Sequence, residues 1–209
     1  MMSEPNDARP FLPERGGLKA LREAASGCRG CHLWRPATQT VFGEGRKGSR
    51  VMLVGEQPGD REDRAGRPFV GPAGRELDRG LEAAGIARPD AYVTNVVKHF
   101  KFEERGRRRI HQTPRRFEIE ACRPRLDEEL AQVKPQALVL LGATAAKALL
   151  GASFRITRER GRLLDSELAP IVSATIHPSA ILRAPDGERE AERQAFAGDL
   201  RVVATALRP

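Results

Sequence analysis

The sequence predicts an α/β protein, a three-layer α/β/α sandwich around a central, mostly parallel four-stranded sheet. Two observations predict it. Four short apolar runs have the composition of buried strands, and segments with helical periodicity separate them. Strands that alternate with helices run parallel, because each helix returns the chain to the same end of the sheet.

The predicted strands are short and carry almost no charge, which is typical of strands covered on both faces. They are residues 50–55, 91–97, 137–141 and 171–176. The predicted helices lie before, between and after them, and two of them open with proline, at Pro72 and Pro114. They are residues 18–26, 72–84, 114–132, 143–150 and 188–207.

The chain has 209 residues, enough for one well-cored domain. We expect residues 1–16 to be a flexible leader and residues 17–209 to form a single domain. The longest uncharged stretch, residues 168–182, is too short and too interrupted by proline to span a bilayer. The amino-terminal segment has no apolar signal-peptide core. We therefore expect a soluble, cytoplasmic monomer with no membrane partner.

The charge balance favours a polyanionic partner. Lys and Arg outnumber Asp and Glu by 36 to 28, and Arg105, Arg107, Arg108 and Arg109 surround Gly106. Basic clusters bind nucleic acid by releasing counterions from phosphates. Charge alone favours a solvated arginine-rich surface equally.

The three cysteines indicate metal binding or redox chemistry. Cys28 and Cys31 form a C-x-x-C pair, and Cys122 lies far downstream, so the three cannot all pair as disulfides. The pair alone also fits a thioredoxin-like motif, structural zinc or, with His32, haem attachment. Ligand spacing does not separate zinc from an iron–sulfur cluster.

The ligand site of such a sheet lies beyond the carboxyl ends of its strands. This rule selects the loops that start at Glu56, Lys98, Gly142 and His177. The first loop, residues 55–74, contains five glycines and three prolines, so its backbone can approach a ligand closely. It matches neither the Walker A pattern nor G-x-G-x-x-G.

Residues 55–74, GEQPGDREDRAGRPFVGPAG, resemble the first motif of the family 4 uracil-DNA glycosylases, and later segments agree in order. These are TNVVK at 94–98, ACRP at 121–124, LGATA at 141–145 and HPS at 177–179. The resemblance extends from about Cys28 to Leu207. It implies excision of uracil from DNA, the first step of base excision repair.

One departure from family 4 resembles the UdgX branch of the superfamily. Lys98 is followed by His99 where family 4 has cysteine, and an arginine-rich loop ends at His111. In that branch the loop histidine is linked covalently to the abasic sugar, and a histidine replaces one cluster cysteine. The resemblance thus implies covalent capture by His111 and a structural [4Fe–4S] cluster. Its implied ligands are Cys28, Cys31, His99 and Cys122, with His32 as a competitor for the fourth position.

Three side chains suit an extruded uracil. Phe69 can stack on the base, Asn95 can pair with O4 and N3–H, and His177 can donate to O2. From the residues alone, Phe69 could instead be an apolar plug and Asn95 a cap of its turn. The resemblance adds further substrate-binding residues, namely Gly55, Gln57 and Ser179.

Cleavage of the glycosidic bond leaves an oxocarbenium-like sugar. Glu56 and Asp60 are the predicted carboxylates that stabilise it or orient a nucleophile. Without the resemblance, His111 reads as a loop histidine that touches a phosphate. The residues assigned to DNA contact or to holding the loop are Arg107, Arg108, Arg109 and Arg183.

The function we expect is a uracil-DNA glycosylase that acts on single- or double-stranded DNA and keeps the abasic strand on His111. One alternative is a conventional family 4-like enzyme that releases its product. The other is a non-catalytic DNA-binding cluster protein.

Overall fold

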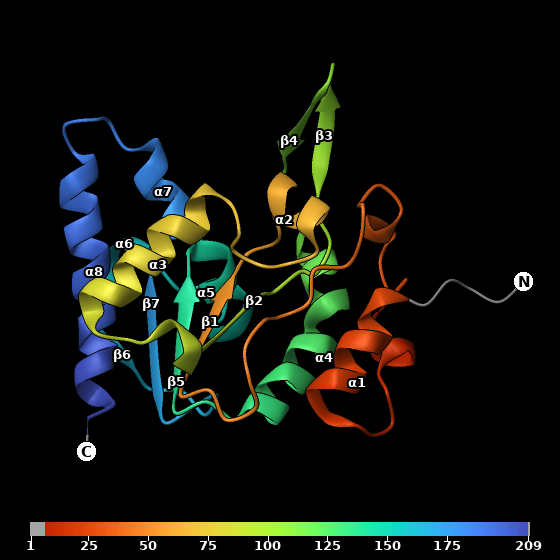
Figure 1. Ribbon diagram of the computed structural model, residues 1–209, viewed down its shortest axis with the longest axis horizontal. Helices are drawn as coiled ribbons and strands as arrows, with labels where there is room; N and C mark the ends of the chain where they lie inside the picture. The colour runs from red at the N-terminus through yellow and green to blue at the C-terminus, as the bar shows by residue number, and fades with distance from the viewer. Residues whose placement is uncertain (1–6, 209) are drawn as a thin grey trace, which may run out of the picture.

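The computed structural model describes residues 7–208, and its centre is a five-stranded sheet in the order β2-β1-β5-β7-β6. Four strands are parallel and correspond to the four predicted ones (Figure 1): β1 (Val51–Gly55), β2 (Ala91–Asn95), β5 (Ala137–Leu141) and β7 (Ile171–Thr175). The prediction of a four-stranded sheet is corrected by β6 (Leu163–Leu164), which pairs antiparallel with β7. Two residues are too short a segment to carry a strand periodicity.

The register of the parallel strands brings their carboxyl ends to one edge of the sheet. Gly55 at the end of β1 lies opposite Asn95 at the end of β2, and Leu141 lies opposite Thr175. The loops that follow these strands therefore start side by side.

Helices cover both faces of the sheet, as predicted. Met52 and Val54 pack on the side of the sheet that holds Leu126 of α4, whereas Leu53, between them in β1, packs with Phe196 of α8. The helices are α1 (Gly17–Ser26), α2 (Asp60–Ala65), α3 (Pro72–Ala84), α4 (Arg116–Val133), α5 (Ala143–Leu150), α6 (Ile156–Glu159), α7 (Pro178–Arg183) and α8 (Arg189–Ala206), with the short 3₁₀ turns η1 (Arg9–Phe11), η2 (His32–Trp34) and η3 (Arg88–Asp90). No helix in the described part of the chain is long and apolar enough to cross a membrane.

The arginine-rich segment, predicted as a loop, forms a two-stranded hairpin of β3 (Phe102–Arg105) and β4 (Arg108–His111). Its turn contains Gly106 at φ +60°, in the left-handed region that glycine favours. The hairpin projects beyond the sheet (Figure 1). Its mostly exposed strands lack an apolar face, so the sequence does not show them as strands.

From Asp7 onward the predicted leader contacts the domain. Ala8 is buried and its N–H donates to the carbonyl of Ala121 in α4. The buried guanidinium of Arg125 donates to the carbonyl of Phe11. Flexibility stays a prediction for residues 1–6, which lie outside the described residues.

Candidate active site

A cavity of about 670 Å³ opens at the carboxyl ends of the parallel strands. All four loops selected from the sequence contribute to it, and so does the end of β4. The predicted site residues that line it are Glu56, Gln57, Phe69, Asn95, His111, His177, Ser179 and Arg183. Asp60, Arg107, Arg108 and Arg109 do not line it.

Three side chains converge above Gly55. A Cβ on this glycine would lie 2.5 Å from Asn95 Oδ1, 2.8 Å from Phe69 Cζ and 3.5 Å from His177 Nε2. The space between them therefore exists only because residue 55 has no side chain. We call these four residues, Gly55, Phe69, Asn95 and His177, the base pocket.

Asn95 presents an unused acceptor to the base pocket. The residue is 2% exposed, and its Oδ1 has no hydrogen-bond partner among the described residues. A buried, unpaired carbonyl oxygen costs about 1–3 kcal/mol. A ligand N–H placed in the pocket would remove that cost.

Phe69 holds its ring in the base pocket by an unusual backbone conformation. Its φ is +55°, a region that residues other than glycine seldom adopt. A Cβ on Gly74 would lie 1.7 Å from the carbonyl oxygen of Phe69, so only glycine permits this fold of the loop onto α3. The Phe69 ring stacks against that of His177, with centroids 6.0 Å apart.

The tautomer of His177 follows from its hydrogen bonds. The Ser179 N–H donates to His177 Nδ1 at 3.2 Å, and Arg183 donates to Ser179 Oγ, which lies 2.8 Å from the same Nδ1. Because a backbone N–H only donates, Nδ1 is the acceptor and the neutral ring carries its proton on Nε2. The Nε2–H group therefore faces the base pocket.

Burial lowers the pKa of His177 to about 4, although the nearby Glu56 carboxylate acts in the opposite direction. We predict that the ring stays neutral from pH 8 to pH 5. Unfolded histidine takes up a proton below about pH 6.5. The folded ring does so only near 4, so acid lowers the free energy of unfolding over this range.

Histidine NMR titration checks this prediction. The His177 signal, assigned by its loss in His177→Asn, should not shift between pH 8 and pH 5. A midpoint near 6.5 would show an ordinary, solvated imidazole.

Glu56 joins β1 to the hairpin. Its Oε1 lies 3.2 Å from His111 Nε2, and its Oε2 accepts a hydrogen bond from Thr144 Oγ1. Burial raises the pKa of Glu56, but the hydrogen bonds from His111 and Thr144 outweigh it and lower the pKa overall. The site thus contains an ionised carboxylate next to a half-exposed histidine. The sequence selects the loop that holds Thr144 but not this side chain.

The side chain of Gln57, which was predicted to contact substrate, is hydrogen-bonded to the backbone on both sides of the hairpin. Its buried amide donates to the carbonyls of Lys101 and Gln112 and accepts from the Lys101 N–H. These two residues flank the hairpin. The side chain of Gln57 therefore holds the base of the hairpin, and with it His111, beside Glu56.

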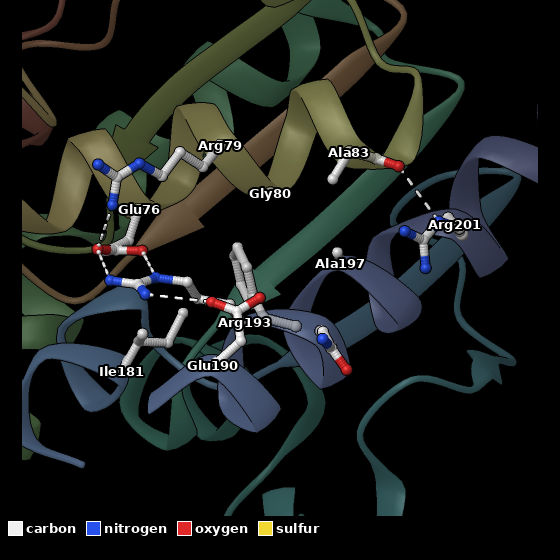
Figure 2. Close-up of a pocket in the computed structure, with 11 residues that line it drawn as sticks. Glu76, Arg79, Gly80, Ala83, Ile181, Glu190, Arg193, Ala197 and Arg201 are labelled. Carbon is white, nitrogen blue, oxygen red and sulfur yellow. Dashed lines mark hydrogen bonds and ion pairs between the residues drawn. The ribbon is translucent and has the colours of Figure 1, made fainter. Parts of the chain in front are cut away.

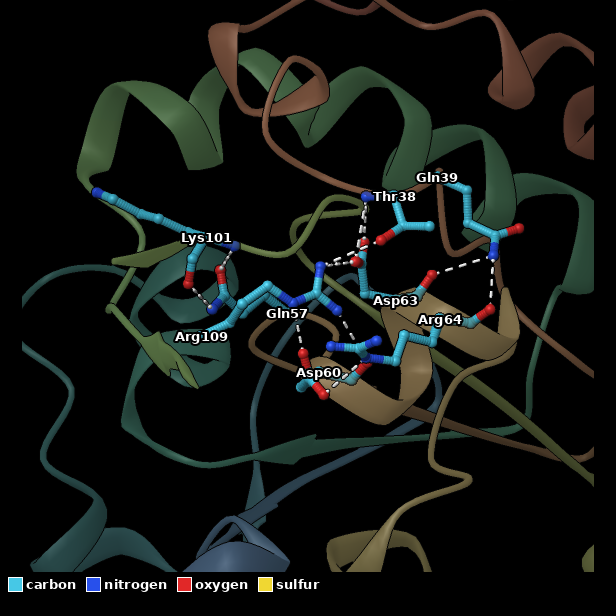
Figure 3. Close-up of polar contacts among 8 residues, drawn as sticks. All are labelled: Thr38, Gln39, Gln57, Asp60, Asp63, Arg64, Lys101 and Arg109. Atoms are coloured by element: carbon cyan, nitrogen blue, oxygen red, sulfur yellow. Dashed lines mark hydrogen bonds and ion pairs between the residues drawn. The ribbon is translucent and has the colours of Figure 1, made fainter. Parts of the chain in front are cut away.

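Arg109 and Asp60 also anchor the hairpin. For Arg109 this is the second of its two predicted roles, holding the loop, and not the phosphate contact; Asp60 faces Arg109 rather than the cavity. The Arg109 guanidinium, whose side chain is 13% exposed, pairs with Asp60 and with the fully buried Asp63 of α2 (Figure 3). It also lies 5.4 Å from the ring centre of Phe100 and 4.9 Å from that of Phe102. Its charge is thus neutralised inside the protein.

Arg107 and Arg108 remain suited to contact with DNA. Both side chains are exposed at the turn of the hairpin. Arg183 is exposed as well, and its bond to Ser179 Oγ connects it to His177 rather than to the hairpin.

A second cavity, of about 540 Å³, lies between α3 and α8 (Figure 2). Its most buried charge, Glu76, pairs with Arg79 and Arg193. A Cβ on Gly80 would lie 2.4 Å from the Phe196 ring, so the two helices cross closely here. None of the predicted site residues lines this cavity.

The predicted metal ligands come from three segments: Cys28 and Cys31 follow α1, His99 follows β2, and Cys122 lies in α4. Within residues 7–208, no three or more His, Cys, Asp or Glu side chains are grouped to hold a metal ion. Burial is the main reason that the pKa of the Cys122 thiol is raised to about 12. The thiols of Cys28 and Cys31 nevertheless lie near enough to act in the same direction.

The fourth predicted ligand, His99, is connected through Thr40 to the segment that holds Cys28. Thr40 Oγ1 is 2.8 Å from His99 Nε2 and donates to the carbonyl of Ala25, which also accepts the N–H of Cys28. Burial lowers the pKa of His99 to about 4, so its ring is neutral. His32 instead places its Nε2 3.2 Å from Glu118. Three thiols and a neutral imidazole are a donor set that fits an iron–sulfur cluster.

The fold and the site define an α/β protein with a carboxylate–histidine pair in a cavity beyond the carboxyl ends of its parallel strands. The chain belongs to the uracil DNA glycosylase superfamily, whose family model matches residues 42–201.

Type-4 uracil-DNA glycosylases are among its relatives. The one from Pyrobaculum aerophilum is 38% identical over 80% of this chain and 86% of its own length. That of Sulfurisphaera tokodaii is 37% identical over 81% and 77%, and that of Thermotoga maritima 38% over 79% and 83%.

Proposed function

We propose that this protein excises uracil from DNA and retains the abasic strand on His111, as the UdgX branch does. The observation that carries the excision is the unpartnered Asn95 Oδ1 inside the base pocket. The observation that supports retention is the placement of His111 against Glu56 at the mouth of the same cavity.

Uracil fits the hydrogen-bonding groups of the pocket. Its N3–H can donate to Asn95 Oδ1, and its O4 can accept from the Asn95 amide nitrogen. Cytosine has no hydrogen on N3 and carries an amino group at position 4, so it opposes both bonds. An extruded uracil would stack on Phe69, in the way that base-flipping enzymes hold their targets.

His177 and Glu56 act on the charges that develop as the bond breaks. The C1′–N1 bond breaks with its electron pair going to uracil, and the His177 Nε2–H stabilises the negative charge on O2. The ionised Glu56 stabilises the positive sugar. The released uracil anion then takes a proton from water.

Covalent capture needs a nitrogen of His111 in place of the usual water. The ring nitrogen that carries no hydrogen donates its lone pair to C1′, and the proton on the other nitrogen, Nε2, passes to Glu56, 3.2 Å away, or to solvent. The resulting neutral imidazole is a poor leaving group, so the strand stays attached. In the alternative, water attacks C1′, the abasic strand is released, and His111 only contacts DNA.

The experiment that tests excision uses labelled DNA with one uracil and the purified wild-type protein. Alkali after digestion of the protein should break the strand at the uracil position. DNA that stays intact under alkali would contradict both enzymatic proposals and leave the non-catalytic DNA-binding alternative. Single-stranded and duplex DNA are both tested, since the arginines of the hairpin turn suit either.

Gly55→Ala should slow excision about tenfold or more, since small displacements of a bound base carry such costs. The new methyl group would lie 2.5 Å from Asn95 Oδ1, inside the base pocket. Single-turnover rates measure the effect. Gly198→Ala is the matched control, because a Cβ there meets no atom within 4 Å. Equal rates for the two variants would mean that uracil binds elsewhere.

We further propose a structural [4Fe–4S] cluster on Cys28, Cys31, His99 and Cys122. The cluster would supply cross-links between the segment after α1, the segment after β2 and helix α4. The His99 nitrogen left to bind iron is Nδ1, because Nε2 contacts Thr40.

Cys28→Ala and His99→Ala should each lose iron, and with it the brown absorbance at about 400 nm that is typical of cysteine-held clusters. His32→Ala should keep both, because His32 contacts Glu118 instead. Iron content and absorption spectra of the purified variants measure this. Zinc in the wild-type protein, or iron loss in His32→Ala alone, would contradict the assignment.

A further inference from the structure

One aromatic ring is left exposed near the cavity. In the described part of the chain, two large apolar side chains are exposed, Phe117 at 51% and Leu163 at 53%. Phe117 lies in the first turn of α4, and its ring centre is 5.8 Å from that of the exposed His32. Nothing in the domain core requires an aromatic ring at this position.

Basic side chains surround this ring. Arg115 and Arg116 precede Phe117 and are exposed, and Arg116 pairs with Glu120. The acidic Glu118 is buried, and Lys101 and His32 lie against its two oxygens. Glu120 offsets the charge of Arg116 and Glu118 that of Lys101, so Arg115 supplies the positive charge beside the ring.

A second aromatic side chain with arginines follows His32. Trp34 lies in the same turn, η2, and the guanidinium groups of Arg29 and Arg35 lie 4.9 Å and 5.8 Å from its ring centre. We call His32, Trp34 and Phe117 the aromatic patch. Aromatic rings interleaved with arginines are the composition of surfaces that bind single-stranded nucleic acid.

The aromatic patch begins close to the cavity. Thr113 lines the cavity, and Phe117 follows it by four residues, a separation of at most about 14 Å even in a fully extended chain. Stacked DNA rises about 3.4 Å per nucleotide along one strand. A strand that leaves the cavity beside Thr113 can therefore reach Phe117 within about four nucleotides.

We propose that the single strand flanking the uracil lies over the aromatic patch, with one of its bases stacked on Phe117 and its phosphates beside Arg115 and Arg116. This inference rests on the proposed excision of uracil. Bases of a duplex are paired and stacked on each other, so they cannot use the patch. The patch therefore favours single-stranded substrate.

Single-turnover excision at increasing protein concentration tests the proposal, because it separates the half-saturating concentration from the maximal rate. On a single-stranded oligonucleotide, Phe117→Ala should raise the half-saturating concentration about fivefold or more. The maximal rate should not change. On duplex DNA, neither the half-saturating concentration nor the maximal rate should change. Phe117→Trp should retain wild-type values and Phe117→Leu should not, because stacking needs an aromatic ring. Leu163→Ala, the matched exposed control, should equal the wild type.

Two results would overturn the proposal: wild-type values for Phe117→Ala on single strands, or an equal loss on duplex DNA. Binding of a single strand can be measured without excision. Trp34 is the only tryptophan of the chain, so its fluorescence reports binding at the aromatic patch directly. A uracil-free oligothymidine should quench its fluorescence, and Phe117→Ala should weaken that binding. Unchanged binding by this variant would refute the patch even if the protein excises nothing.

Discussion

His111→Ser should abolish the covalent protein–DNA adduct completely. The serine side chain is shorter than that of histidine and has no ring nitrogen, so it can neither reach C1′ nor form the stable N–C1′ bond. Glu56 and the base pocket remain, so uracil should still be removed and the strand should become alkali-labile. A denaturing gel of labelled uracil DNA, run before and after alkali, measures both outcomes.

Arg105→Ser is the matched control for this variant. Arg105 lies in the same hairpin, is exposed and pairs only at the surface with Glu103. It should form the adduct as the wild type does. An undiminished adduct in His111→Ser would show that another residue is the nucleophile.

Lys98→Met should destabilise the fold by about 3–5 kcal/mol, the usual cost of removing one partner of a buried ion pair. Lys98 is 1% exposed and pairs with the fully buried Glu129, whose other oxygen accepts from Tyr92. Lys98 also donates to Thr94 Oγ1 and to the Asn95 carbonyl, both at 2.6 Å. Losing it leaves a buried carboxylate without its cation and removes the hydrogen bond to the Asn95 carbonyl.

Urea and thermal unfolding measure this loss, expected to be roughly 6–20 °C in Tm for a domain of this size. Arg116→Met is the control, because its partner Glu120 is exposed and such pairs contribute about 0–1 kcal/mol. Glu129→Gln added to Lys98→Met should restore much of the stability. Equal stability of Lys98→Met and Arg116→Met would mean that the buried pair contributes little.

The strands and the residues at their ends could be predicted because their signals are local. A short apolar run followed by glycine or a polar residue marks a buried strand and its exit, and parallel strands bring their exits together. This rule selected the loops that contain Phe69 and His177, and the resemblance supplied Asn95 and the roles of all three. The structure brings all three to Gly55.

Long-range partners could not be predicted in the same way. Arg109 and Asp60 are 49 positions apart in sequence, and Gln57 and Gln112 are 55 apart. Nothing local shows that these side chains meet, so a phosphate contact and a catalytic carboxylate were as reasonable as a hairpin anchor. The short strand β6 and the polar hairpin escaped detection because neither has an apolar face to reveal it.

Excision and covalent capture are both measured on a denaturing gel of the wild-type protein after incubation with labelled single-stranded DNA containing one uracil. Excision with capture predicts a labelled band at the combined mass of protein and DNA that survives heat and detergent. Free DNA that breaks at the uracil position in alkali would contradict capture and establish a conventional glycosylase. Free DNA that resists alkali would contradict excision itself.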